Sequence, residues 1–187
     1  MRRLLLRSFV QAPLTEPAPP ADDRALAELA ARVNQVSRRR LGRTLAIREV
    51  DAGSCNGCEL EIHALGNVLY DLERFGLKFV ASPRHADVLL VTGPVTVNMR
   101  EALERTYQAT PDPKWVIAVG DCARNGGVFA ESPACVGGVS AVLPVDLHVP
   151  GCPPSPIVLL GGLLALLEDS STGTPRGQGG REKEGGA

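Results

Sequence analysis

Residues 115–122 read Trp115-Val116-Ile117-Ala118-Val119-Gly120-Asp121-Cys122, an unbroken apolar run followed at once by glycine, aspartate and cysteine. Such a run predicts a buried β-strand, and Gly120 and Asp121 mark the turn in which that strand ends. The run lacks polar alternation, which favours a strand covered on both faces of a sheet. This stretch therefore predicts a parallel sheet with a cysteine just beyond the end of one strand.

The neighbouring sequence repeats the alternation of strand and helix on both sides of this stretch. Further strands are expected over residues 45–50, 78–81, 87–92 and 146–149. Apolar residues at helical spacing predict helices over residues 22–38, 60–75, 99–107 and 156–167. Strands that alternate with helices predict an α/β fold with helices on both faces of a parallel sheet.

Four of the five cysteines lie in turn-rich segments, and the three segments that hold them follow predicted strands. They are Gly53-Ser54-Cys55-Asn56-Gly57-Cys58, Gly120-Asp121-Cys122 and Pro150-Gly151-Cys152-Pro153-Pro154. In parallel α/β sheets, ligands bind beyond the carboxyl ends of the strands. We therefore expect Cys55, Cys58, Cys122 and Cys152 to converge in space.

Four converging thiolates suit a 4Fe-4S cluster, a two-iron cluster or a zinc ion. One Cys-x-x-Cys pair with two distant cysteines lacks the paired spacing of structural zinc sites, which favours a cluster over zinc and over a redox dithiol. Cys135 is an alternative to Cys122, but Cys122 follows a strand directly. A spare cysteine is usually a buried free thiol.

Composition and charge indicate the cellular compartment and the kinds of partner expected for the chain. Its 187 residues are 44% hydrophobic, enough for one core, and five cysteines without a convincing secretory signal predict the reducing cytosol. The longest apolar run has eleven residues, short of the roughly 18 that a spanning helix needs. Residues 1–43 hold nine arginines against four acidic residues, which suits an acidic partner, an anionic membrane surface or plain solvation. Without interleaved aromatic residues, nucleic acid is not expected as a partner.

These observations predict three regions along the chain. Residues 1–43 form a basic N-terminal arm with one helix, residues 44–168 an α/β iron–sulfur domain, and residues 169–187 a disordered tail. The helix of the arm has an apolar stripe that would lie on a partner or at a membrane interface.

The motifs in combination resemble a known family. They are Gly53-Ser54-Cys55-Asn56-Gly57-Cys58-Glu59-Leu60-Glu61, Ser82-Pro83-Arg84-His85-Ala86-Asp87, Gly120-Asp121-Cys122 with Gly126-Gly127, and Val149-Pro150-Gly151-Cys152-Pro153-Pro154. Over about residues 44–167 the chain resembles the small subunit of membrane-bound group 4 nickel–iron hydrogenases, of the formate hydrogenlyase and hydrogenase-4 type. That small subunit is similar to the B-type subunit, the 20 kDa subunit, of NADH–quinone oxidoreductase.

The resemblance implies a flavodoxin-like fold and one 4Fe-4S cluster with Cys55, Cys58, Cys122 and Cys152 as ligands. It also implies an electron-transfer subunit, inactive alone, on the cytoplasmic face of the membrane. Its partners would be a large subunit with the nickel–iron site, a ferredoxin-like iron–sulfur subunit and membrane subunits. No cysteine follows Cys152, so the second and third clusters of uptake hydrogenases are not expected.

Two alternatives to the hydrogenase hypothesis stay open. A quinone-linked complex would use the same cluster to reduce quinone, but its 20 kDa subunit characteristically has adjacent cysteines where this chain has Cys55-Asn56-Gly57-Cys58. A non-enzymatic, zinc-stabilised interaction module belongs to another class of protein. Iron and sulfide content would separate it from both electron carriers.

Several other residues near the motifs are candidates for a role. Glu59 and Glu61 suit the positive end of a helix, and Glu61 is the candidate proton relay because related hydrogenases carry a glutamate just after this Cys-x-x-Cys. Arg84 and His85 form either a surface turn or part of the large-subunit interface. Arg124 could raise the potential of a cluster. His63 and His148 are expected to be structural.

Overall fold

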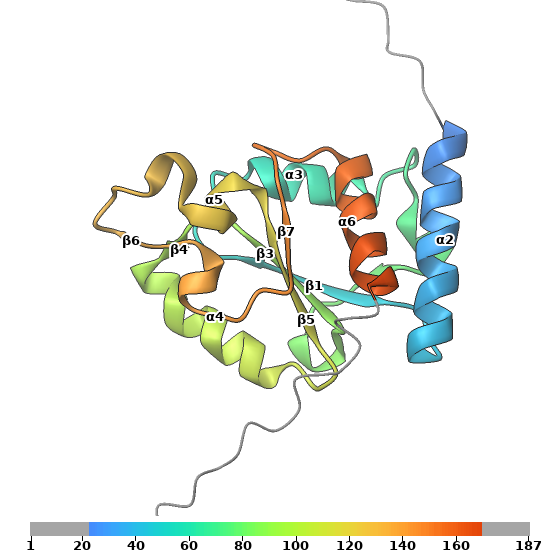
Figure 1. Cartoon of the computed structure of the whole chain (residues 1–187), viewed down its shortest axis with the longest axis horizontal. Helices are drawn as coiled ribbons and strands as arrows, with labels where there is room; N and C mark the ends of the chain where they lie inside the picture. The colour runs from blue at the N-terminus through green and yellow to red at the C-terminus, as the bar shows by residue number, and fades with distance from the viewer. Residues whose placement is uncertain (1–22, 170–187) are drawn as a thin grey trace, which may run out of the picture.

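The computed structural model describes residues 23–169, and within them five strands form a parallel sheet in the order β2-β1-β3-β5-β7 (Figure 1). The strands are β1 (Ala46–Asp51), β2 (Lys78–Phe79), β3 (Val88–Thr92), β5 (Trp115–Val119) and β7 (Leu147–Val149). The chain runs outward from β1 to β2, then returns to β3 and continues the other way. This is the flavodoxin-like, doubly wound order, and the predicted α/β fold is confirmed.

The central strands are the most apolar because the sheet is covered on both faces. Every residue of β3 and β5 is buried, as their unbroken apolar sequences predict. The two strands pair in register from Val88 with Trp115 to Thr92 with Val119. Their carboxyl ends therefore lie level at one edge of the sheet, which is the edge that carries the cysteine segments.

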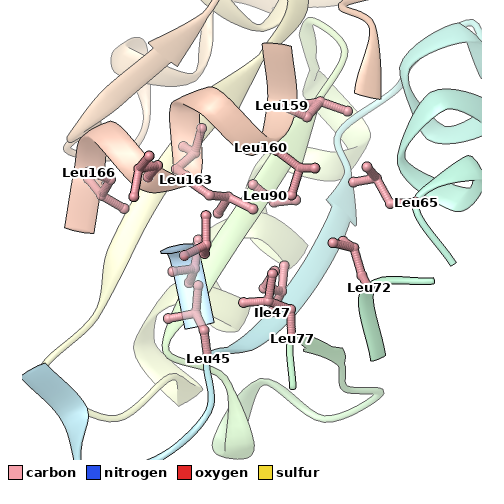
Figure 2. Packing of buried hydrophobic residues seen from close by; sticks show 14 of the residues in the cluster. Leu45, Ile47, Leu65, Leu72, Leu77, Leu90, Leu159, Leu160, Leu163 and Leu166 are labelled. Atoms are coloured by element: carbon pink, nitrogen blue, oxygen red, sulfur yellow. The ribbon is translucent and has the colours of Figure 1, made fainter. Parts of the chain in front are cut away.

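One face of the sheet is covered by α2 (Asp23–Leu41), α3 (Gly57–Ala64), the short 3-10 helix η1 (Leu72–Phe75) and α6 (Pro156–Glu168). Figure 2 shows Leu160 of α6 beside Leu90 of β3, and Ile47 of β1 beside Leu77, all within one core cluster. The other face is covered by α4 (Val97–Ala109) and α5 (Gly120–Asn125), with Leu103 and Ala123 packed against Leu89 and Ala118.

Helix α2 runs beside α6 at the outer side of this layer (Figure 1). Its apolar stripe places Ala30 and Val33, both fully buried, in the same core cluster as the leucines of α6. Arg32 reinforces the contact through an ion pair with Glu168, at 2.7 Å. The stripe is thus occupied within the chain. Residues 1–22 of the predicted arm and residues 170–187 of the predicted tail lie outside the described residues.

The prediction of one continuous helix over residues 60–75 is wrong. Helix α3 ends at Ala64, and the Asn67 side chain then accepts hydrogen bonds from the backbone N–H groups of Leu69 and Tyr70, which turns the chain. Asp71 follows in the left-handed conformation, and η1 begins at Leu72. Leu69, which a continuous helix would place on its apolar face together with Ile62 and Leu65, is 77% exposed.

The chain between β3 and β7 contains elements that the sequence did not reveal. Strands β4 (Val95–Thr96) and β6 (Cys135–Gly137) form a small antiparallel sheet, and residues near it form η3 (Gly127–Phe129) and η4 (Val139–Ala141). A further 3-10 helix, η2 (Pro83–His85), precedes β3. These pieces are too short to carry a hydrophobic period. Within residues 23–169 no helix is long and apolar enough to cross a membrane.

Candidate functional site

The loop that carries Cys55 and Cys58 is fixed by the aspartate at the end of β1. Asp51 Oδ1 accepts hydrogen bonds from the backbone N–H groups of Gly53 and Ser54, both at 2.7 Å. Asn56 then takes the left-handed conformation, with φ 71°, and α3 begins at Gly57. Cys58 is therefore the second residue of α3, where the positive end of the helix dipole favours a thiolate.

The segments that carry Cys122 and Cys152 are tied to each other through Asp121. The Asp121 N–H donates to the Gly151 carbonyl at 2.9 Å, and Asp121 Oδ1 accepts from the Gly151 N–H at 3.2 Å. Cys122 lies in the short helix α5, directly after β5, whereas the sequence predicted a loop there. Cys122 therefore still lies at the end of the strand, but its backbone is helical.

All four predicted cysteines line one cavity of about 100 Å³ at the carboxyl edge of the sheet. Two glycines make room for their sulfurs. A Cβ at Gly120 would lie 2.7 Å from Cys58 Sγ, and a Cβ at Gly127 would lie 2.7 Å from Cys122 Sγ. Both distances are shorter than real carbon–sulfur contacts, so only glycine leaves these thiols where they are. The cavity is a cradle built from backbone and sulfur.

Burial, and secondarily the neighbouring thiols, raise the pKa values of two of the four cysteines. Burial raises the pKa of Cys58 to about 12, and the charge of Glu59 and the other three thiols add to the shift. The pKa of Cys122 is also raised, chiefly by burial and by Cys152, while the Val128 N–H donates to its sulfur and lowers it. The raised pKa values favour the protonated thiols, so four thiolates are stable here only when a cationic group binds between them.

The donor set discriminates between a single metal ion and a larger group. Among the described residues, no three or more His, Cys, Asp or Glu side chains are arranged to hold a single metal ion. A zinc ion bound by thiolates at about 2.3 Å would leave no cavity between the sulfurs. A volume of about 100 Å³ corresponds instead to several atoms. The four thiols fit a polynuclear iron–sulfur group.

The fifth cysteine lies apart from this cavity. Cys135 is on β6, opposite Thr96 of β4, and does not line the cavity. All five cysteines are free thiols. The placement agrees with the preference for Cys122 over Cys135 as a candidate ligand.

The two glutamates of α3 have different surroundings. Glu61 is half-buried and does not line the cysteine cavity, so its relay role stays a prediction. Glu59 is only 6% exposed, and within residues 23–169 neither of its carboxylate oxygens has a hydrogen-bond partner. Glu61 was preferred over Glu59 because of the resemblance to related hydrogenases, and the sequence does not show which of two glutamates at a helix start is buried.

The remaining candidates lie at the surface. Arg84 and His85 are exposed in η2, whose first turn is capped by Ser82 Oγ, and Arg124 is exposed in the last turn of α5. His63 is exposed on α3 and lies 3.5 Å from Glu49, measured from Nε2 to Oε2. His148 is exposed on β7.

Large apolar side chains are exposed just after three of the candidate ligands in the chain. Leu60 on α3 is 61% exposed, Val128 on η3 is 85% exposed, and Ile157 in the first turn of α6 is 52% exposed. Phe129 and Val158 are exposed beside them. We call these five residues the apolar rim. Their elements begin at the carboxyl edge of the sheet, and such a patch is typical of a protein interface.

Comparisons with known proteins agree with this geometry. Residues 55–166 match the family described as NADH ubiquinone oxidoreductase, 20 Kd subunit. The chain is 52% identical to a probable membrane-bound hydrogenase subunit of Pyrococcus furiosus over 128 residues, which cover 68% of this chain and 77% of that protein. It is 44% identical to formate hydrogenlyase subunit 7 of Escherichia coli K12, over 81% of this chain and 59% of that protein.

Two further similarities extend the range of relatives. The B-type subunit of the NADH-quinone oxidoreductase of Heliobacterium modesticaldum is 49% identical over 110 residues, 58% of this chain and 63% of that protein. A chain from the structure of a membrane-bound sulfane sulfur reductase, an archaeal respiratory membrane complex, has a TM-score of 0.60 and 34% identity, covering 74% of each chain. This chain thus spans less than two thirds of two of the named relatives.

Proposed function

Because the chain belongs to the family of the 20 kDa subunit of NADH ubiquinone oxidoreductase, and its relatives are subunits of oxidoreductase complexes, we propose a specific role within such a complex. The chain is an electron-transfer subunit that carries one 4Fe-4S cluster beside the nickel–iron site of a partner large subunit. The complex reduces protons to dihydrogen or oxidises dihydrogen. The chain is inactive without its partners.

One observation carries the proposal: thiols from three separate strand-end segments line the same cavity. Cys55, Cys58, Cys122 and Cys152 would each hold one iron. A 4Fe-4S cluster supplies one-electron transfer when it is bound there. The chain supplies a rigid cradle, in which Asp51 and Asp121 fix the three segments and Gly120 and Gly127 leave room for the sulfurs.

The apolar rim supports the docking of a partner over the cysteine cavity. Leu60, Val128 and Ile157 would be buried by that partner, which would exclude water from the space between two redox centres. We assign this face to the large subunit. A ferredoxin-like iron–sulfur subunit and membrane subunits would complete the complex, with this chain peripheral on the cytoplasmic side.

Two observations favour the hydrogenase over the quinone-linked complex. The two residues between Cys55 and Cys58 differ from the adjacent cysteines characteristic of the quinone-linked 20 kDa subunit, and two of the named relatives are hydrogenase or formate hydrogenlyase subunits. The 49% identity to an NADH-quinone oxidoreductase subunit supports quinone reduction as the second candidate function. The zinc module is disfavoured by the size of the cavity.

The test is metal analysis of this chain after the native complex has been purified and its subunits separated without oxygen. We expect iron and acid-labile sulfide in equal amounts on this chain, with the electron paramagnetic resonance signal of a reduced 4Fe-4S cluster. Zinc without sulfide would end the cluster proposal. Nickel in the co-purified large subunit would support the hydrogenase, whereas quinone reduction by a nickel-free complex would establish the second candidate.

A further inference from the structure

A second and larger cavity, of about 460 Å³, is lined by residues of β1, of α3 and of the segment that begins with β2. We call it the β1-edge cavity, because Arg48 and Glu49 of β1 line it together with His63 of α3 and Phe79 of β2. Among the described residues, the two cavities have no lining residue in common. Strand β2 pairs only with Ala46 and Ile47, whereas β1 continues to Asp51, so the sheet edge beside this cavity has no strand partner within residues 23–169.

The polar groups of the β1-edge cavity are incompletely paired within the described part of the chain. His63 Nε2 lies 3.5 Å from Glu49 Oε2, but the buried Glu49 Oε1 and Arg48 Nε have no hydrogen-bond partner. Glu59, whose two oxygens are also buried without a partner, lies within electrostatic range of Glu49. Of the residues with unpaired buried atoms, only Arg48 and Glu49 line the cavity, so one acceptor atom and one donor atom there lack a partner in the described chain. Buried polar atoms in native proteins are rarely left so.

The charges and walls of the cavity indicate the chemistry of the missing group. Glu49 is the only acidic residue among the described residues that line the cavity, and its unpaired carboxylate oxygen favours a group that donates hydrogen bonds. Glu59 and Asp51 add negative charge nearby, whereas Arg48 and His63 add positive charge. Ile62, Phe79 and Val80 give the cavity apolar walls. A lysine or arginine side chain has both parts, an aliphatic stem and a cationic head. The backbone carbonyl of the same residue could accept from Arg48 Nε.

We propose that the β1-edge cavity binds a basic side chain carried by an extended segment of a partner subunit. The cationic head donates to Glu49 Oε1, and the segment runs along the open edge of β1, where β2 has ended. This inference rests on the proposed function only in that the chain works within a complex. The contact involves none of the residues that line the cysteine cavity.

Photo-cross-linking in the intact complex tests the occupant directly. Ala81 lines the cavity and is exposed, so p-benzoylphenylalanine at this position would react with whatever enters. We expect a cross-link to a segment of another subunit with a lysine or arginine within a few residues of the attachment. The matched control is the same probe at the exposed Ser140 on η4, which should not reach that segment.

The substitution Glu49→Gln tests the charge. It keeps the shape of the side chain and should weaken retention of the cross-linked subunit at least fivefold, measured as dissociation during salt washing, because the basic head loses its ionic acceptor. The exposed Glu131→Gln should leave retention unchanged. Equal retention in Glu49→Gln and wild type would overturn the proposal.

Iron and sulfide counted in the same preparations separate this inference from the proposed function. A chain without iron that still forms the cross-link refutes the cluster and leaves the basic-side-chain site standing. A chain loaded with iron and sulfide that forms no cross-link, or whose cross-linked segment lacks a basic residue, overturns the site and leaves the cluster standing.

Discussion

The two cavities beside α3 are built in opposite ways. In the cysteine cavity the segments are held by backbone hydrogen bonds to Asp51 and Asp121, and glycines leave space of fixed shape for four sulfurs. In the β1-edge cavity the walls are side chains, and buried polar atoms of Arg48 and Glu49 lack partners in the described chain. A rigid backbone cradle suits a permanently bound inorganic group. Side-chain polar groups without hydrogen-bond partners suit a partner subunit that binds when the complex assembles.

The cysteine cavity should depend absolutely on its four thiols. We expect Cys152→Ser to abolish the native 4Fe-4S signal, because a serine hydroxyl replaces a thiolate ligand. Cys135→Ser should leave the signal intact, since Cys135 lies on β6 outside the cavity. Iron and sulfide analysis with electron paramagnetic resonance measures both. Loss of the signal in Cys135→Ser would reverse the choice of ligands.

Next in size is the effect of a methyl group on the cradle. Gly120 has φ +87°, and its Cβ would lie 2.7 Å from Cys58 Sγ, so Gly120→Ala should cost about 3 kcal/mol in the free energy of unfolding and displace a ligand. Gly161→Ala is the control, because nothing lies within 4 Å of its Cβ. Because Gly161 lies within helix α6, Gly161→Ala should raise the free energy of unfolding by about 0.5–1 kcal/mol. Equal effects in urea titrations would show that the cradle is not rigid.

A smaller loss is expected where a side chain fixes the cysteine loop. Asp51→Ala removes the acceptor of two backbone N–H groups and should cost about 1–2 kcal/mol, because exposed donors regain water. Asp51→Asn keeps a side-chain oxygen and should restore much of this loss. The readouts are the free energy of unfolding and the rate of iron loss to a chelator. Identical iron loss in both variants would contradict this role for Asp51.

The sequence predicted the cysteine cavity because its chemistry lies in conspicuous residues. Cysteines at the ends of apolar strands fix both the sheet edge and the donor set, and the parallel order follows from the alternation of strands with helices. Asp51 and Asp121 were missed as organisers of the loops, since an aspartate beside a turn has many uses. No pattern marks which carboxylate will be bonded to backbone across 30 residues, as Asp121 is to Gly151.

The β1-edge cavity was missed for a different physical reason. Gly66, one of its lining residues, lies just beyond the end of α3 at Ala64, where the 3.6-residue period predicted that the helix continues to residue 75. Asn67 ends that helix through local hydrogen bonds that compete with helical ones. Leu69 fitted the apolar stripe by spacing alone and is exposed, and Glu59, two residues before Glu61, is the buried one.

The smallest expected effect is a change in how the free energy of unfolding depends on pH. The sign of this change should distinguish a variant of the β1-edge cavity from variants of the cysteine cavity. Burial raises the pKa of Glu49 above its ordinary value, Glu59 and Asp51 add to the shift, and His63 and Arg48 oppose it. The protonated form of Glu49 is therefore favoured in the folded chain. The free energy of unfolding should fall as the pH rises from the pKa of Glu49 in the unfolded chain to its higher pKa in the folded chain.

Glu49→Gln removes this titration, so the isolated chain should become slightly more stable than wild type at pH 7 and equally stable near pH 4. Urea titrations across this range measure the difference, with Glu131→Gln as the control. An unchanged slope in Glu49→Gln would show that the carboxylate is not strained by burial. In the complex the same substitution should weaken partner retention. An interface that contains an unpaired charge predicts a variant that stabilises the free chain but weakens the assembly. The cysteine variants should instead impair both the stability of the chain and its assembly.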